Sequence, residues 1–195
     1  MFLSKKSVTF AVSALAMLCS GAAFAKEAPQ AHKAVELSIL HINDHHSYLE
    51  PHEARINLNG QQTKVDIGGF SAVNGKLYEL RKKYKNPLVL HAGDAITGTL
   101  YFTLFGGSAD AAVMNAGNFH YFTLGNHEFD AGNEGLLKLL EPLKIPVLSA
   151  NVIPDKNSIL YNKWKPYDIF TVDGEKIAII GLDLSLIHIS EPTRP

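Results

Sequence analysis

Three predicted strands each end in a short run of polar residues, and this repeated pattern constrains the fold more than any other feature of the chain. The strands span 36–42, 88–90 and 121–124, and they lead into Asn43–His46, Gly93–Asp94 and Gly125–Asp130. In an open α/β sheet the carboxyl ends of neighbouring strands meet at one crevice. We therefore expect the three polar runs to face one another, although they lie far apart in the sequence.

Helix-like segments lie between these strands, which indicates a layered α/β core. Apolar residues recur every three or four positions across 70–84, the spacing of one helix face. Ser108 is expected to cap a helix that ends at Gly117, and a Leu-rich helix is expected over 134–143. Residues 43–69, which are rich in Asn, Gln and Gly, are interpreted as a loop.

The last part of the chain adds two further predictions of strand structure. Residues 147–150 are apolar and predict a fourth strand. Asp173-Gly174 separates 167–172 from 176–182, and this dipeptide is typical of the tight turn of a hairpin.

The composition indicates a folded globule and argues against several kinds of partner. Hydrophobic residues make up 46% of the 195 residues and charged residues 19%, a balance that excludes a disordered or coiled-coil chain. The formal net charge is -1, so no basic surface indicates nucleic acid as a partner. No feature of the sequence implies a protein partner. The length fits one domain or part of a larger one.

Residues 1–25 have the features of a secretory signal peptide. Lys5 and Lys6 precede an apolar run over 7–19, and Ala23-Phe24-Ala25 provides the small residues that signal peptidase requires. Cleavage is expected after Ala25, followed by a linker over 26–35. The apolar run is shorter than the roughly 20 residues of a membrane span, so no membrane anchor is expected. The alternative is a core helix that resembles a signal.

The polar runs after the strands contain ligands for divalent metal ions. Asp44 and His46 are two residues apart, so in an extended chain both side chains would point to the same side and could bind one ion, with His45 pointing away. Asp94 could bridge two ions about 3.5 to 4 Å apart, the separation used for in-line attack on phosphorus. Asn126 could bind the second ion through its amide oxygen. These donors suit Zn²⁺, Mn²⁺ or Mg²⁺.

His127 and Asp130 are candidates for proton transfer at the same site. A protonated His127 could stabilise charge on a phosphate oxygen or on the leaving group. Asp130, three residues later, could orient the imidazole and hold its protonation state.

Each of these features also has a structural interpretation when it is taken alone. The Asp-His-His run could be a solvated turn or an N-cap, and Asn-His-Glu could cap the next helix. His91 follows a buried strand and is expected to be a core histidine. Gly68-Gly69 is interpreted as a tight turn rather than a phosphate cradle, and Trp164 as a packing residue. The three runs in this order favour a functional site over these separate explanations.

The chain contains, in this order, the segments LxILHINDHH, LxLHAGD and FTLGNHEFD. With these segments it resembles the calcineurin-like metallophosphoesterases, specifically the secreted bacterial 5′-nucleotidase and UDP-sugar hydrolase group. The resemblance implies the N-terminal part of a four-layer α-β-β-α sandwich, over 36–183, with two divalent ions. Asp44 and His46 match ligands of the first ion, Asp94 the bridge, and Asn126 a ligand of the second. His127 and Asp130 match the catalytic pair.

The same resemblance implies the reaction and its location. In such enzymes a metal-bound water attacks the phosphorus of a phosphate or pyrophosphate. The expected substrates are nucleotides, with NAD cleaved to NMN and AMP and phosphate then removed from the mononucleotides. UDP-sugars and 2′,3′-cyclic nucleotides are the alternatives. The expected location is the periplasm.

The end of the chain departs from the family pattern. Residues 184–195 look like a translated transposon-type sequencing adapter, which predicts a non-native tail on a truncated copy. The alternative is a natural strand in which His188 is a ligand. Family members continue into further histidine-bearing loops and a base-binding domain, so this chain alone is expected to be inactive. A second hypothesis is a non-catalytic fragment that at most binds metal or nucleotide.

Overall fold

The computed structural model describes residues 34–184. The expected signal peptide, residues 26–33 of the linker, and all of the predicted tail after Leu184, including the alternative ligand His188, lie outside these residues. Within residues 34–184, no helix combines the length and the apolar character that a bilayer crossing would need.

A four-stranded parallel sheet forms the centre of the fold, as the strand pattern predicted. Its order is β1 (Ser38–Ile42), β4 (Pro87–His91), β5 (Tyr121–Thr123) and β6 (Val147–Leu148). Ile42 lies opposite His91, and His91 lies opposite Phe122, so the carboxyl ends of three strands are aligned at one edge. The prediction that the three polar runs share an edge of a sheet is confirmed.

Helices connect the strands and cover one face of the sheet. They are α1 (Phe70–Lys83), the short α2 (Leu100–Phe105), α3 (Ser108–Ala116) and α4 (Gly132–Leu140), and a 3-10 turn, η1 (Asn126–Phe129), precedes α4. The strand order β1-β4-β5-β6 never reverses. Because crossovers between parallel strands are right-handed, an order without reversal places the connecting helices on the same face.

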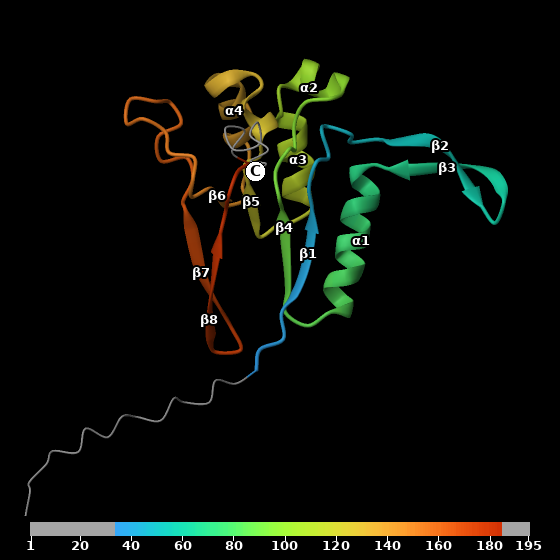
Figure 1. The fold of residues 1–195 in the computed structure, drawn as a ribbon, viewed down its shortest axis with the longest axis horizontal. Coiled ribbons are helices and arrows are strands. Elements are labelled where there is room, and N and C mark those ends of the chain that lie inside the picture. The colour runs from blue at the N-terminus through green and yellow to red at the C-terminus, as the bar shows by residue number, and fades with distance from the viewer. Residues whose placement is uncertain (1–33, 185–195) are drawn as a thin grey trace, which may run out of the picture. The chain divides into compact units, whose positions relative to one another are not determined.

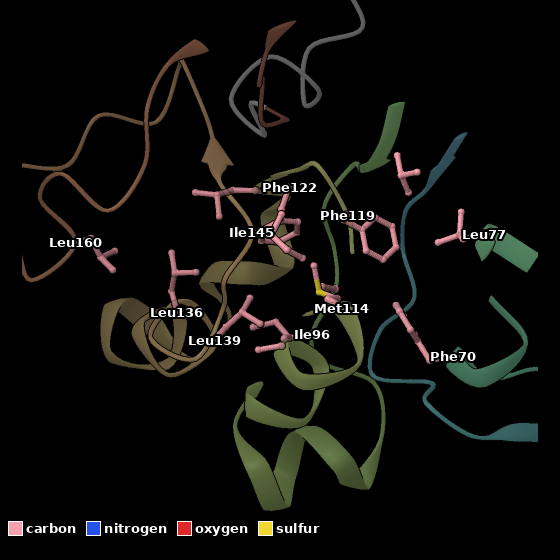
Figure 2. Packing of buried hydrophobic residues seen from close by; sticks show 14 residues of the cluster. Phe70, Leu77, Ile96, Met114, Phe119, Phe122, Leu136, Leu139, Ile145 and Leu160 are labelled. Carbon is pink, nitrogen blue, oxygen red and sulfur yellow. The ribbon is translucent and has the colours of Figure 1, made fainter. Parts of the chain in front are cut away.

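The hydrophobic core lies between these helices and the sheet. Val89 and Phe122 from the central strands are fully buried, and Met114 and Leu136 from α3 and α4 are fully buried too. Figure 2 shows Phe122, Met114 and Leu136 in one cluster with other buried side chains, among them Phe70, Phe119 and Ile96. This packing orients the strands, and therefore the loops at their carboxyl ends.

The opposite face of the sheet carries the hairpin of β7 (Tyr167–Val172) and β8 (Glu175–Ile180). Tyr121 alternates with Phe122 along β5 and so points away from the helices, and its hydroxyl donates to Asp168 Oδ2 at 2.9 Å. The Asp173-Gly174 turn is confirmed, because both residues have positive φ, as a type I′ turn requires. The described residues thus supply three of the four expected layers; a second helical layer is not found among residues 34–184.

The interpretation of residues 43–69 as a loop was wrong. These residues contain an antiparallel hairpin, β2 (Pro51–Leu58) and β3 (Gln61–Gly68), which extends away from the sheet in Figure 1. Its turn is Asn59-Gly60, with φ values of 53° and 86°. Asn-Gly is a strong signal for a two-residue hairpin turn, and the loop interpretation rested instead on the Asn, Gln and Gly content of the segment.

The helix predictions need two corrections. α4 spans Gly132–Leu140 rather than the predicted 134–143. α1 and α3 occupy the expected residues, but Ser108 is not the cap of α3. Gly107 takes that position with a φ of 95°, and the Ser108 hydroxyl donates to the carbonyl of Phe105 at the end of α2. A short connection between two helices required the left-handed backbone of glycine at the cap.

Candidate metal and catalytic site

The loop after β1 and the loop after β4 are joined by backbone hydrogen bonds. Asp44 N–H donates to Gly93 O at 3.0 Å, His46 N–H to Asp94 O at 3.2 Å, and Ser47 N–H to Ala95 O at 2.9 Å. The two loops therefore continue the pairing of their strands beyond the sheet. This pairing fixes Asp44 and His46 relative to Asp94.

The loop after β5 contacts the loop after β4 through two glycines. A Cβ on Gly93 would lie 2.7 Å from Gly125 N, and a Cβ on Gly125 would lie 2.7 Å from Asp94 N. Neither approach is possible for a larger residue without movement of the backbone. Asp94 Oδ1 accepts a hydrogen bond from His127 N–H at 2.9 Å, which anchors one carboxylate oxygen.

Three predicted site residues meet at the edge of the sheet. Ligand atoms of His46, Asp94 and His127 all lie within 4.8 Å of one another. Asp44 joins them, since its Oδ1 lies 3.7 Å from His46 Nε2. Asn126 is the first residue of η1 and precedes His127, so it lies at the same edge. The spatial convergence expected from the sequence is confirmed.

The reason given for the proximity of Asp44 and His46 was wrong. The expectation assumed an extended chain, but Asp44, His46 and Ser47 all have left-handed backbone, with φ values of 53°, 46° and 55°. Asp94, in the facing loop, has a φ of 54°. Such conformations are costly for residues other than glycine and cluster at functional sites, where the surrounding structure maintains them.

His127 and Asp130 form the expected pair. His127 Nδ1 lies 2.7 Å from Asp130 Oδ2, and both side chains are about two-fifths exposed. The hydrogen bond to Asp130 is the main cause that raises the pKa of His127. Because Nδ1 is bonded to Asp130, the other ring nitrogen, Nε2, is the one available to a substrate or an ion.

Glu128 has a role that the sequence analysis did not assign. Its buried carboxylate accepts three backbone hydrogen bonds, from Asp94 N–H at 2.9 Å, Ala95 N–H at 2.7 Å and Gly125 N–H at 2.6 Å. Burial raises its pKa to about 7, against the opposing effect of these hydrogen bonds. Glu128 therefore links the loop after β4 to the loop after β5 through hydrogen bonds. In the sequence, this role is indicated by its position between His127 and Asp130.

Three structural interpretations from the sequence are confirmed. His91 is buried and bonded to His45 and to Gly93 N–H, as expected of a core histidine. His45 points away from Asp44 and His46 into the core. Gly69 caps α1 in a tight turn, and Trp164 packs against the core with its indole N–H donating to Val152 O.

The sequence comparison decides the family. The profile described as "Calcineurin-like phosphoesterase" matches residues 37–192, which include every residue of the site. The chain belongs to this family. The metallophosphoesterase fold expected from the resemblance is therefore confirmed, and with it the assignment to a family of hydrolases.

Several relatives of this calcineurin-like phosphoesterase are named as nucleotidases. The chain is 92% identical over 183 residues to the NAD 5′-nucleotidase of Haemophilus influenzae, covering 94% of this chain and 30% of the relative. It is 54% identical over 148 residues to a probable 5′-nucleotidase of Treponema pallidum, covering 76% and 25%. The chain thus spans about a third or less of the length of these relatives.

Solved structures agree with this assignment. The structure of the H. influenzae NAD nucleotidase superposes with a TM-score of 0.78 and 93% identity, over 80% of this chain and 31% of the other. A 5′-nucleotidase precursor from Thermus thermophilus superposes with a TM-score of 0.68 and 38% identity, over 75% and 28%.

Proposed function

We propose that this chain forms the metal-binding and proton-donating part of a periplasmic phosphohydrolase that acts on nucleotides. The observation that carries the proposal is the meeting of His46, Asp94 and His127 within 4.8 Å, from loops that follow three different strands. The likeness to a protein named NAD 5′-nucleotidase supports NAD, NMN and AMP as the substrates. The apolar run and the Ala-Phe-Ala sequence before residue 26 support export.

Two divalent ions would be held by Asp44, His46, Asp94 and Asn126, and Asp94 would be shared between the two ions. The residues fit this role because carboxylate, imidazole and amide donors together suit Zn²⁺, Mn²⁺ or Mg²⁺. The left-handed backbone at Asp44, His46 and Asp94 supports a functional constraint on these positions. Bound ions of this kind lower the pKa of water and withdraw charge from phosphoryl oxygens.

His127 would act on the substrate directly. Asp130 accepts a hydrogen bond from His127 Nδ1–H, which fixes the orientation of the ring. This hydrogen bond raises the pKa of His127 and so favours the protonated ring. An imidazolium held in this way carries its second proton on Nε2. We assign to Nε2–H the stabilisation of a phosphate oxygen, or the donation of a proton to the leaving group.

The test uses two proteins, because the chain spans only 30% of its H. influenzae relative. One is this chain. The other is a hybrid enzyme: the H. influenzae relative with its matching segment replaced by the residues of this chain. Phosphate release from NMN and AMP, and cleavage of NAD, are measured with Mn²⁺, Zn²⁺ or Mg²⁺.

The hybrid enzyme is expected to hydrolyse all three nucleotides, and Asp94→Ala is expected to lower the rate by more than about 100-fold, since loss of an outer partner of a ligand already costs about 10- to 100-fold. Asp168→Asn is the matched control, because this carboxylate lies on the opposite face of the sheet and bonds to Tyr121. Equal rates for Asp94→Ala and the parent would refute the proposal. Preference for UDP-sugars or 2′,3′-cyclic nucleotides would change the substrate class, and metal binding without turnover by the hybrid would favour a binding module.

A further inference from the structure

Four polar side chains lie inside the apolar core directly beneath the candidate site. They are His45 and Ser47 from the loop after β1, His91 at the end of β4, and Asp110 in the first turn of α3. Ser47 and Asp110 are fully buried, His91 is 1% exposed, and the His45 side chain is 9% exposed. Aromatic rings surround them, with Phe70 at 4.7 Å from His45 and Phe119 at 5.6 Å from His91 between ring centroids.

The hydrogen bonds of this group have one consistent direction. Gly93 N–H donates to His91 Nδ1 at 3.2 Å, so that nitrogen carries no proton and the neutral ring carries its proton on Nε2. His91 Nε2–H must then donate to His45 Nδ1 at 2.8 Å, which leaves the His45 proton on Nε2. Burial lowers the pKa of His91 well below its usual value, in agreement with a neutral ring.

Both donor paths end at the carboxylate of Asp110. His45 Nε2–H donates to Oδ1 at 3.0 Å, and the Ser47 hydroxyl donates to Oδ2 at 3.1 Å. The chain of bonds therefore runs from Gly93 through His91 and His45 to Asp110. It connects the loop after β1, the loop after β4 and α3 in a single network.

The network contacts the backbone next to three proposed metal ligands. His45 lies between Asp44 and His46, and Gly93 immediately precedes Asp94. Asp44, His46 and Asp94 all have left-handed backbone, which persists only where surrounding contacts hold it in place. A buried carboxylate that is held only by hydrogen bonds is no more stabilising than an apolar core residue of similar size, so stability alone does not account for Asp110 and its partners.

We propose that Asp110, through His45 and His91, is a positioning residue that fixes the two metal-ligand loops, so that a buried carboxylate on α3 determines the affinity of the site for its ions. This proposal rests on the proposed function, because it assumes that Asp44, His46 and Asp94 bind metal. Asp110 touches neither substrate nor ion, and acts only through the histidines and Ser47.

The test is Asp110→Asn in the hybrid enzyme. An Asn side chain can accept from only one of the two donors, and its NH₂ group then faces the other. Mn²⁺ affinity, measured by calorimetry on the metal-free protein well below its melting temperature, is expected to fall by about 10- to 100-fold. The phosphatase kcat at saturating Mn²⁺ is expected to recover toward the parent value.

Met114→Ala is the matched control, because Met114 is equally buried in α3 but lies outside the network. It is expected to destabilise the protein, at about 2–5 kcal/mol for such a truncation, without changing Mn²⁺ affinity. Ser47→Ala removes one donor to Asp110 and is expected to weaken Mn²⁺ binding by less than about tenfold. This variant decides the question if Asp110→Asn does not fold.

The outcomes separate the two proposals. A parent hybrid that binds no Mn²⁺ would refute the proposed function and this inference with it. A parent that binds Mn²⁺, with unchanged affinity in Asp110→Asn and Ser47→Ala, would refute only the positioning network. An equal loss of affinity in Met114→Ala would also refute it, because the effect would then follow from destabilisation of α3.

Discussion

The two edges of the parallel sheet are both rich in polar residues, yet they use them differently. At the edge formed by the amino ends of the strands, two polar side chains bond to nearby backbone groups: Arg81 donates to the carbonyls of Gly117 and Asn118 after α3, and His120 Nδ1 accepts from Val89 N–H. At the carboxyl edge, the side chains of His46, Asp94 and His127 point to one another. At the amino ends of the strands, these side chains satisfy backbone groups where helices and strands end. At the carboxyl ends, charged and metal-ligating side chains lie close together.

Because of this difference, substitutions can distinguish residues that stabilise the fold from residues that act at the candidate site. Substitutions at the amino edge should change the free energy of unfolding with little effect on activity. Substitutions at the carboxyl edge should change activity with a smaller effect on stability. The hybrid enzyme defined above is suitable for both measurements.

The largest effect is expected from Gly125→Ala at the carboxyl edge. Gly125 has a φ of −111°, which alanine can adopt, so the effect is steric: the new methyl group would displace the Asp94 backbone and carboxylate. We expect phosphatase activity to fall by more than about 100-fold, because the ligand itself is displaced and loss of only an outer partner of a ligand already costs about 10- to 100-fold.

Gly75→Ala in α1 is the control for Gly125→Ala, because no atom lies within 4 Å of the added methyl group. It should raise the free energy of unfolding by about 0.5–1 kcal/mol and leave the rate unchanged. Normal activity in Gly125→Ala would show that the loops after β4 and β5 do not depend on this close approach.

The next effect concerns the pair at the end of η1. His127→Gln is expected to lower kcat by about 10²- to 10⁴-fold, the usual contribution of a positioned acid or base. Asp130→Asn should cost less, because an amide oxygen still accepts from Nδ1–H but supplies no charge. Steady-state kinetics with NMN measure both. A larger loss in Asp130→Asn than in His127→Gln would contradict the assignment of roles.

A smaller effect, on stability rather than activity, is expected from Arg81→Met at the amino edge. The substitution keeps an apolar side chain of similar length and removes two hydrogen bonds of 2.7 and 2.6 Å to the carbonyls after α3. We expect a loss of about 1–2 kcal/mol in the free energy of unfolding, measured with urea. Lys82→Met, on the exposed side of α1, serves as the control. A loss of activity in Arg81→Met would contradict the view that residues at the amino ends of the strands affect stability and not activity.

The smallest effect is expected on the pH dependence of folding stability, through His120. Burial lowers the pKa of this histidine, so below about pH 6.5 the unfolded chain takes up a proton that the folded chain resists. Stability contributed by the neutral ring is therefore present above that pH and is lost as the pH falls. His120→Asn keeps an acceptor for Val89 N–H and should reduce this acid loss by less than about 0.5 kcal/mol, because the ring is partly exposed. Melting temperatures at pH 7.5 and 5.5 compare the two proteins; an identical acid loss would refute this role.

The sequence predicted most of the sheet and the identity of the candidate site. Apolar periodicity placed α1, and a continuous apolar run placed β4. Asp173-Gly174 placed the β7–β8 hairpin, and the polar runs after three strands placed Asp44, Asp94 and His127 at one edge. These features are local: they depend on spacing along the chain and on the rule that parallel strands end together. The β2–β3 hairpin was missed although the Asn59-Gly60 turn and the alternating apolar residues Ala54, Ile56 and Leu58 were present, because the Asn, Gln and Gly content of the segment favoured a loop.

Only the tertiary structure decided which polar residues are buried, and what they contact. Asp110 lies in a short helix that also carries exposed residues, and its contact with His45 joins positions 65 residues apart. Glu128 belongs to an exposed-looking polar run, yet it is buried and accepts hydrogen bonds from Asp94 N–H and Gly125 N–H. Sequence spacing fixes which face of an element a side chain occupies, but the partner it meets there depends on how the elements pack, and that packing is a property of the whole chain.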